Sequence, residues 1–338
     1  MKIIFYIPDN AKNDATLYYV ELVKKAFEKL NFVVEEFTNT NFEFNKNDYF
    51  FTIRSRDFVK IFFKTFSLNI IHWYQGIGPE EYLLINKGCL KARFISFLFT
   101  ILEFFIFRIA FLNFYVSESM KNFLEKKYKK RKKNYGIIPC YNKKLNEIYF
   151  CENVKIKNSF VYAGSLFGWQ CYEQTIKLYS EIEKKIEEPS LTILTKDIVE
   201  AEEMVKKYKL KDCKIYYVPL NDLDKELSKF QFGFLLRENI NINNVSTPTK
   251  MNSYLSSGII PIYSDVIHAF KSNIDLGEFN MSLDKLENFD FLIQKIIDIE
   301  IDYEKFYEVC KIIFDKYYND EINVCLIKEA FEGTYENK

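Results

Sequence analysis

The sequence predicts an α/β protein built from two doubly wound domains. The chain has 338 residues, which is enough for two domains of roughly 150 residues that each bury a core. Short apolar runs typical of strands alternate with segments of helical spacing in both halves. Such alternation builds a parallel sheet with right-handed crossovers. We therefore expect one domain in 1–155, a second in 156–300, and C-terminal helices in 301–338 that pack back on the first domain.

The elements of the first half follow from its apolar pattern. Residues 2–7 form the first expected strand, because this apolar run is too short for a signal peptide. Residues 14–30 have the spacing of an amphipathic helix. Ser117 is placed to cap a helix that starts at Met120 and runs to about residue 130. Further strands are expected at 32–37, 48–53, 69–74, 114–116 and 135–139.

The second half repeats the same order of elements, which predicts another doubly wound sheet. Its strands are expected at 160–162, 191–194, 214–218, 232–236 and 259–263. Its helices are expected at 174–186, 199–208, 222–230 and 250–256. A last helix at about 303–318 is expected to pack back across the first domain.

Charge is divided unevenly between the halves, although the net charge is zero. Residues 1–150 hold 24 Lys and Arg against 15 Asp and Glu, a net +9, and the remainder is −9. The apolar stretch 94–114 is interrupted by Glu103 and Arg108. Each mid-bilayer charge costs roughly 2.5–3.5 kcal/mol on insertion. We expect a buried or interfacial helix that does not span a membrane.

A basic run at 126–133 places seven Lys or Arg in eight positions. Together with 94–114 it could form a peripheral membrane contact, since basic residues are attracted to anionic lipid surfaces. A solvated helix end is the alternative interpretation. The charge pattern shows no nucleic-acid motif, so nucleic acid is not an expected partner.

The seven cysteines include no CxxC pair, and the chain has only two histidines. This pattern favours reduced thiols in the cytosol and argues against a zinc site. We expect a cytoplasmic protein, at the inner face of the membrane if the docking surface is used. No metal and no cofactor are expected.

The strongest functional signal is a buried strand that ends in Arg237 and Glu238, followed by a loop and by Lys250 at a helix start. Ligands of open α/β sheets bind at the carboxyl ends of the strands. A helix N-terminus with hydroxyls and a lysine suits a diphosphate. The alternative is a helix-capping loop without a ligand. The loop hydroxyls are those of Ser246, Thr247 and Thr249.

The segment TPTKMNSYLSSGIIPI at 247–262 resembles the donor-site helix of family 4 glycosyltransferases, in the branch that carries Pro-Thr-Lys. The chain departs from that pattern at Ser253, where the family has a Glu that holds the donor ribose. The resemblance implies a GT-B fold, with two Rossmann-like domains and a cleft between them. It assigns acceptor binding to the first domain and nucleotide-sugar binding to the second. Ser253 would contact the ribose.

Two further segments support the resemblance. The segment VYAGSLFGWQ at 161–170 resembles the first strand and loop of the donor domain, with Gly164, Ser165 and Trp169 as candidate contacts. Gly164 has no side chain to block a phosphate. In the first half, His72 follows an apolar strand and is a candidate for contact with the transferred sugar or acceptor. A packed core histidine is the alternative. Glu80 or Glu81 is a candidate base.

The resemblance implies a hexosyltransferase that moves a sugar from a nucleoside-diphosphate sugar to a glycan or lipid-linked acceptor in bacterial surface polysaccharide synthesis. Retention of anomeric configuration is expected. Arg237 and Lys250 would stabilise the leaving phosphate, and Glu238 is a further candidate. Alternatives are an epimerase or polyol-phosphate transferase of the same fold. A partner subunit without turnover, which binds nucleotide or glycan and scaffolds an active transferase, is the non-enzymatic alternative.

Overall fold

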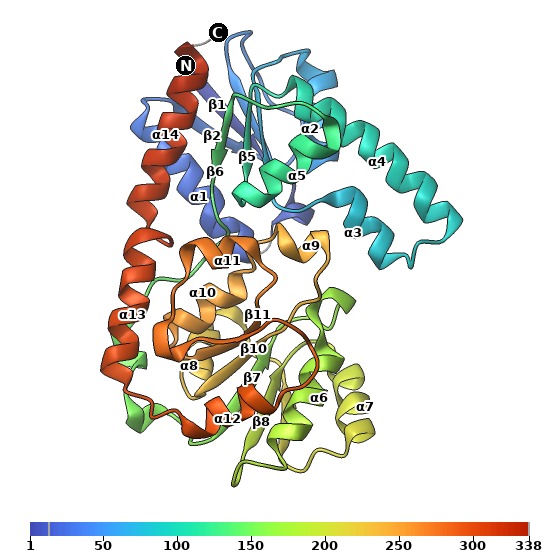
Figure 1. The fold of residues 1–338 in the computed structure, drawn as a ribbon. Helices are drawn as coiled ribbons and strands as arrows, with labels where there is room; N and C mark the ends of the chain where they lie inside the picture. The colour runs from blue at the N-terminus through green and yellow to red at the C-terminus, as the bar shows by residue number, and fades with distance from the viewer. Residues whose placement is uncertain (13, 337–338) are drawn as a thin grey trace. The chain divides into compact units, whose positions relative to one another are not determined.

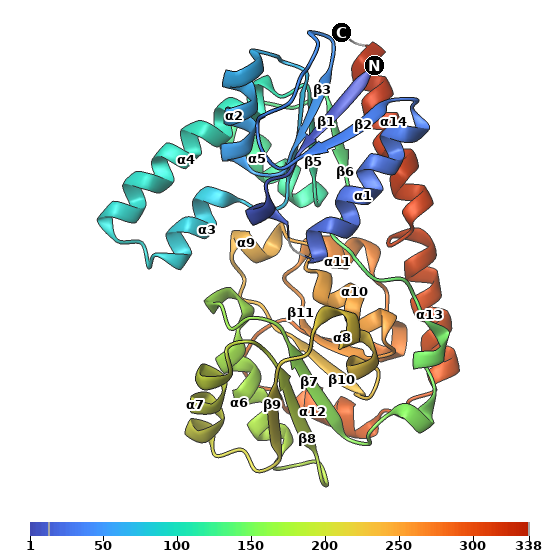
Figure 2. The same cartoon turned by 180° about the vertical axis from the view of Figure 1, so that it is seen from behind.

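The computed structural model describes residues 1–12 and 14–336 and contains two parallel six-stranded sheets. Each sheet belongs to its own compact unit (Figures 1 and 2). The first unit consists of Met1–Asn142, Val245–Thr247 and the chain from Asn319 onward. The second consists of Lys143–Asn244 and Pro248–Tyr318. Neither unit is a continuous piece of the chain.

The first sheet has the strand order β2-β1-β3-β4-β5-β6. Its strands are β1 (Lys2–Tyr6), β2 (Val33–Phe37), β3 (Tyr49–Thr52), β4 (Ile70–Tyr74), β5 (Leu112–Tyr115) and β6 (Tyr135–Ile137). Its helices are α1 (Asp14–Lys29), α2 (Ser55–Thr65), α3 (Gly78–Ile85), α4 (Leu90–Ile109), α5 (Glu118–Tyr128) and α14 (Asp320–Glu336). The chain moves outward from β1 to β2 and then crosses to β3, so the strand order reverses between β1 and β3.

The second sheet has the strand order β12-β11-β10-β7-β8-β9, and its order reverses between β7 and β10. Its strands are β7 (Ser159–Ala163), β8 (Ser190–Leu194), β9 (Cys213–Tyr216), β10 (Phe232–Leu235), β11 (Ile260–Ser264) and β12 (Met281–Leu283). Its helices are α6 (Tyr172–Ile182), α7 (Ile198–Tyr208), α8 (Leu220–Leu227), α9 (Asn241–Asn244), α10 (Thr249–Ser256), α11 (His268–Asn273), α12 (Asp290–Asp298) and α13 (Tyr303–Lys316). Short 3-10 turns lie at Asp9–Ala11, Glu147–Tyr149, Glu152–Val154, Gly168–Gln170 and Gly277–Phe279.

The C-terminal segment contains two helices with different positions. The helix expected at about 303–318 is α13, and it belongs to the second unit, where Phe306 packs against Phe150 and Phe279. The final helix α14 instead packs on α1 and β6 of the first unit. The expected packing on the first domain is therefore made by α14. The helix expected at 303–318, α13, packs within the second unit instead.

Phe331 is the apolar anchor of α14. Its ring contacts the rings of Phe27, Phe32, Tyr49 and Phe111 at centroid distances of 5.1–5.8 Å. At the start of the helix, the Tyr18 and Tyr141 hydroxyls each donate to the Asp320 carboxylate at 3.0 Å.

One local prediction, the Ser117 cap, is confirmed. The Ser117 hydroxyl accepts a hydrogen bond from the Met120 N–H at 3.0 Å and caps α5. Gly258 follows the end of α10 with φ +66, and an added Cβ would lie 2.7 Å from the Tyr149 carbonyl oxygen. A residue with a side chain would be strained and would clash at that position.

The apolar stretch 94–114 does not form a single element. Most of it belongs to α4, and the chain then enters β5 at Leu112. Helices α3 and α4 form a hairpin that projects from the sheet of the first unit (Figures 1 and 2). In residues 1–12 and 14–336, no helix combines the length and apolar character needed to cross a bilayer.

Candidate functional site

The candidate site lies at the switch point of the second sheet, between β7 and β10. The two strands run parallel and pair Phe160 with Phe232, so their carboxyl ends meet at one edge of the sheet. Gly164 follows β7 and Arg237 follows β10. Lys250 lies in the first turn of α10. We name Gly164, Arg237 and Lys250, together with Tyr162 of β7, the switch-point cluster.

Lys250 connects the members of this cluster. Its Nζ lies 4.1 Å from the centre of the Tyr162 ring and 3.4 Å from Gln170 Oε1. Burial and the nearby charge of Arg237 lower the pKa of Lys250 well below its usual value. A Cβ added to Gly164 would lie 3.3 Å from this Nζ, and Gly164 has φ +137. The glycine therefore provides both the backbone conformation and the space that the lysine uses.

Arg237 is the second cation of the cluster, and its side chain is buried. Its N–H donates to Ser264 Oγ at 2.8 Å, and its Nη1 donates to the Leu236 carbonyl at 2.9 Å. Burial lowers the pKa of Arg237. Among the described residues, neither Arg237 nor Lys250 has a carboxylate oxygen within 4.0 Å. Two cations in one place without a counter-charge favour an anionic ligand.

Tyr254, which the sequence analysis did not identify, holds the two strand ends in place. Its hydroxyl accepts from the Ala163 N–H at 3.3 Å and donates to the Phe234 carbonyl at 3.1 Å. Tyr254 lies one turn after Lys250 on α10, so both side chains share one helix face. That spacing is the signal by which the sequence could have indicated it.

Two further candidates, Ser165 and Trp169, follow Gly164 within five residues in the sequence. The Ser165 carbonyl accepts from the Tyr162 hydroxyl at 2.6 Å. Trp169 stacks on Phe167, with ring centroids 4.9 Å apart and 15° between the planes. Phe167 is 56% exposed, so this stacked pair presents an aromatic surface to solvent.

Ser253, Thr249 and Glu238 are less closely tied to the cluster. Ser253 Oγ donates to the Thr249 carbonyl at 3.2 Å, within their own helix. The hydroxyl proton is therefore used locally, although its oxygen can still accept a bond. Glu238 is exposed and accepts from Gln174 Nε2 at 3.5 Å.

Ser246 and Thr247 belong to the first compact unit, in the segment Val245–Thr247. There, the Cys140 N–H donates to Thr247 Oγ1 at 3.1 Å. The Thr247 hydroxyl thus has a structural bond in the first unit. Both residues directly precede α10 in the sequence, but they belong to a different compact unit from Lys250.

His72 lies within β4 of the first unit and is 1% exposed. Its Nδ1 is 3.0 Å from Thr52 Oγ1, and its ring meets Phe58 and Tyr74 edge-on. Burial lowers its pKa to about 3, so the ring is uncharged at neutral pH. This environment favours the alternative interpretation of a packed core histidine.

The two candidate bases beside His72 in the sequence have structural partners. Glu80 lies 2.9 Å from Lys127 Nζ. Glu81 accepts from the Ile77 N–H at 3.1 Å. A Cβ on Gly76 would fall on the Glu81 carboxylate, so this glycine allows the carboxylate to fold back over the loop. These contacts give both carboxylates a role in holding α3.

Residues 1–12 and 14–336 contain no group of three His, Cys, Asp or Glu side chains arranged to hold a metal ion. The absence of a metal and of a cofactor from the reaction stays a prediction.

Comparison with solved structures identifies the fold. HepE from Anabaena in complex with UDP-glucose matches with a TM-score of 0.66 at 11% identity, over 100% of both chains. A TarM variant from S. aureus, in complex with fondaparinux, α-GlcNAc-glycerol and UDP, matches with a TM-score of 0.65 at 14% identity. That match covers 92% of this chain and 58% of the TarM chain. A glycosyltransferase from Rickettsia africae matches with a TM-score of 0.59 at 10% identity, over 100% of this chain and 99% of that one.

No protein-family model and no curated protein sequence matches the chain. The structural matches, together with the two parallel sheets, confirm the expected GT-B fold of two Rossmann-like domains.

Proposed function

We propose, with the GT-B fold as premise, that the chain transfers a sugar from a nucleoside-diphosphate sugar to a glycan or lipid-linked acceptor. The observation that carries the proposal is the pair Arg237 and Lys250 at the switch point, without a carboxylate partner among the described residues. A nucleoside diphosphate leaves with negative charge, and fixed cations in a desolvated site stabilise such a charge strongly. Gly164 would allow the phosphates to approach the backbone.

The nucleotide to test first is UDP, because HepE and the TarM variant are both described in complex with it. The exposed stack of Phe167 and Trp169 offers a surface on which a nucleobase could lie. We further propose that a hexosyl group is transferred with retention, in polysaccharide synthesis, as the resemblance of 247–262 implies.

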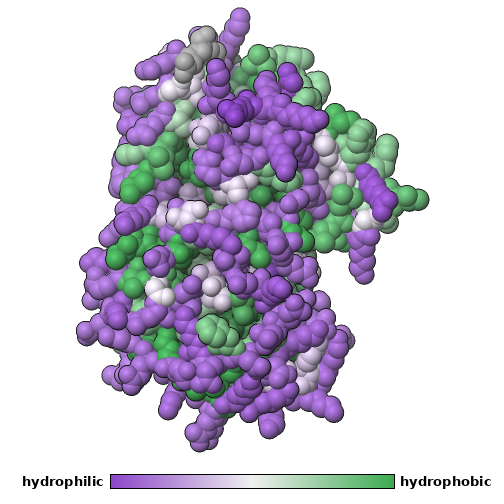
Figure 3. All heavy atoms as spheres, in the orientation of Figure 1, coloured by the Kyte–Doolittle hydropathy of each residue, from purple (hydrophilic) through white to green (hydrophobic). Residues whose placement is uncertain are grey.

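We also propose that the α3–α4 hairpin docks on a membrane surface. Exposed apolar side chains on α4 include Leu90, Phe94 and Phe97, which are 83%, 64% and 60% exposed. Figure 3 shows the hydrophobic surface of this projecting hairpin. Lys91 and Arg93 are exposed on the same helix and would meet anionic headgroups.

The proposed contact uses the first part of the expected stretch 94–114. The second part of the apolar stretch is buried, as Phe107, Leu112 and Phe114 show. In the basic run, Lys127 pairs with Glu103 at 2.7 Å. Lys132 donates to the Ala110 carbonyl at 2.7 Å, and burial lowers its pKa to about 8. The exposed apolar side chains of α4 lie at Leu90 and between Phe94 and Ile101.

A second candidate function is a partner subunit that binds nucleotide without turnover. Ser253 favours it, because a serine replaces the expected carboxylate and its proton is bonded to the Thr249 carbonyl. A hydroxyl is a weaker acceptor for ribose than a carboxylate. Binding without turnover, rescued by a co-expressed partner, would support this candidate.

The test is a thermal-shift screen of UDP, GDP and CDP on the wild type and on Lys250→Met, followed by donor turnover. UDP at 100 times its dissociation constant should stabilise the wild type by about 2.7 kcal/mol. Lys250→Met should lose this shift and turnover, yet melt at the same temperature as the wild type or higher without ligand. The reason is that the folded state lowers the pKa of Lys250 and therefore disfavours its charge. Equal UDP shifts in both proteins would remove Lys250 from the site.

A further inference from the structure

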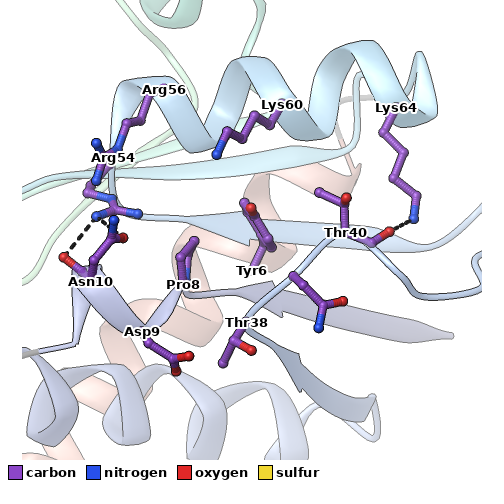
Figure 4. Close-up of a pocket in the computed structure, with 11 residues that line it drawn as sticks. Tyr6, Pro8, Asp9, Asn10, Thr38, Thr40, Arg54, Arg56, Lys60 and Lys64 are labelled. Carbon is purple, nitrogen blue, oxygen red and sulfur yellow. Dashed lines mark hydrogen bonds between the residues drawn. The ribbon is translucent and has the colours of Figure 1, made fainter.

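The first sheet has a switch point of its own, between β1 and β3, and a hollow of about 790 Å³ lies there. Its walls come from the loops after β1 and β2 and from α2 (Figure 4). The size lies in the range of small-molecule sites. The carboxyl edge of a parallel sheet at its switch point is where such folds bind ligands.

One face of α2 makes this hollow basic. Arg56, Lys60 and Lys64 follow at intervals of four residues and line the same side of the helix. Lys64 is engaged, because its Nζ donates to the carbonyls of Thr40 and Phe42. Arg56 and Lys60 are exposed and have no carboxylate oxygen within 4.0 Å among the described residues. In Figure 4, Lys60 points from α2 towards the strand end that carries Tyr6.

The acidic side chains in and beside the hollow do not neutralise its positive charge. Asp57 is fully buried, and its Oδ2 pairs with Arg54 Nε at 2.5 Å. The same arginine donates through Nη1 to Asn10 Oδ1 at 2.8 Å, which fixes the wall (Figure 4). Asp9 also lines the hollow and is exposed, and Lys12 pairs with Glu36 at 2.6 Å while lying 3.9 Å from Asp9. Asp57 offsets Arg54, and the lining keeps a net positive charge because Arg56, Lys60 and Lys64 outnumber Asp9.

Tyr6 adds a hydrogen-bond donor to the hollow. The residue lines the hollow and is only 3% exposed, but its hydroxyl oxygen is not enclosed by protein. This hydroxyl is therefore available to a group that enters the hollow. Burial and the nearby Asp57 carboxylate raise the pKa of Tyr6, although Arg54 and Arg56 oppose this effect, so the hydroxyl keeps its proton and can donate it. A ligand in the hollow would meet a hydroxyl donor together with two cations.

We infer that this hollow, defined by Tyr6, Arg56 and Lys60, binds an anionic group of the acceptor substrate. The inference rests on the proposed function and narrows its acceptor class to glycans or polyols that carry phosphate or carboxylate groups. Tyr6 donates to the anion, Arg56 and Lys60 neutralise it, and Thr38 and Asn10 are placed to bond neighbouring hydroxyls.

The experiment is calorimetric titration of the full chain, saturated with UDP, against three probes. These are a short glycerol-phosphate oligomer, a glucuronic-acid-containing disaccharide and maltose. We expect binding of at least one anionic probe and none of maltose, and the probe that binds identifies phosphate or carboxylate as the recognised group. Arg56→Gln with Lys60→Gln should weaken that binding about tenfold or more, and Tyr6→Phe about tenfold.

The matched control is Lys46→Gln with Lys133→Gln, which removes two exposed charges of the first unit away from the hollow. This pair should bind the anionic probe as the wild type does. Absence of binding by both anionic probes, or equal weakening in the control pair, overturns the inference. UDP binding is measured beforehand: its failure contradicts the proposed function, whereas UDP binding without anion binding contradicts the anion site alone.

Discussion

Lys250 and Arg237 occupy positions in which burial and mutual repulsion oppose their charges. The sequence located both residues, because a strand end followed by a loop and a helix start is visible in the apolar pattern. It did not show that Gly164 makes room for the lysine or that the Tyr254 hydroxyl ties two strand ends together. The contacts of Lys250 with Gly164 and of Tyr254 with Ala163 join residues more than 80 positions apart, and only the crossover topology brings them together.

A pH effect follows from His72. Its folded pKa is about 3, and an unfolded histidine titrates near 6.5. The unfolded chain therefore binds an extra proton between these values, and stability should fall as pH drops through this window, by roughly 1.4 kcal/mol per pH unit. Urea unfolding of the first unit at a series of pH values should show this slope in the wild type.

His72→Asn should lower the pH slope, whatever its effect on absolute stability. His268→Asn is the matched control, because His268 is exposed and is the only other histidine of the sequence. Its unfolding should retain the wild-type slope. An unchanged slope in His72→Asn would show that the His72 ring is charged in the folded protein.

At the scale of elements, α4 illustrates how a helix that is apolar on two sides can serve two surroundings. Its buried side packs on the rest of the first unit through residues such as Ile106 and Phe107, and its opposite side is exposed and apolar. Glu103, which interrupts the apolar stretch in the sequence, is buried and paired with Lys127 and the Tyr128 hydroxyl. Glu103 therefore helps to attach α4 to α5.

Phe94→Ser with Phe97→Ser should weaken binding to vesicles that contain phosphatidylglycerol. Each phenylalanine contributes roughly 1.5–3 kcal/mol when buried, so the loss should be about tenfold or more. Sedimentation with vesicles measures it. The control is Val199→Ser with Phe291→Ser, which removes exposed apolar side chains of the second unit. Equal binding by the α4 variant and the wild type would contradict docking through this hairpin.

Helix α14 packs on the rest of the first unit through several buried side chains, and Phe331, which is 3% exposed, is the one that joins an aromatic cluster. Phe331→Ala should destabilise this unit by about 3–5 kcal/mol, because it removes a ring from a packed aromatic cluster. Leu326→Ala on the same helix is the control, since Leu326 is 43% exposed and should change stability little. Urea unfolding followed by Trp73 fluorescence in a Trp169→Phe background reports on the first unit alone. Similar losses in both variants would argue against this cluster as the attachment.

At the scale of the whole molecule, the two compact units are interleaved in the sequence. The first unit needs α14, which follows the entire second unit in the chain. A fragment of residues 1–142 should therefore fold poorly, whereas the same fragment joined to 319–336 through a flexible linker should fold. Circular dichroism and proteolysis measure the difference.

The fragment 143–318 should fold by itself, because it contains every strand of the second sheet. It should also bind UDP if the switch-point cluster is the donor site. Full folding of 1–142 without α14 would show that the C-terminal helix is dispensable.

The sequence by itself determined the α/β class, most strand positions and the placement of Gly164, Arg237 and Lys250 at strand and helix ends, because the periods of strands and helices and the residues at strand ends are local properties. Ser117 and Gly258 were identifiable for the same reason, since a cap and a left-handed turn need particular residues at particular positions. Only the tertiary structure decided which strands are neighbours, that α14 and not α13 packs on α1, and that His72 is enclosed. It also revealed the basic hollow at the first switch point, since Tyr6 and Lys60 belong to separate elements that meet only after the sheet has formed.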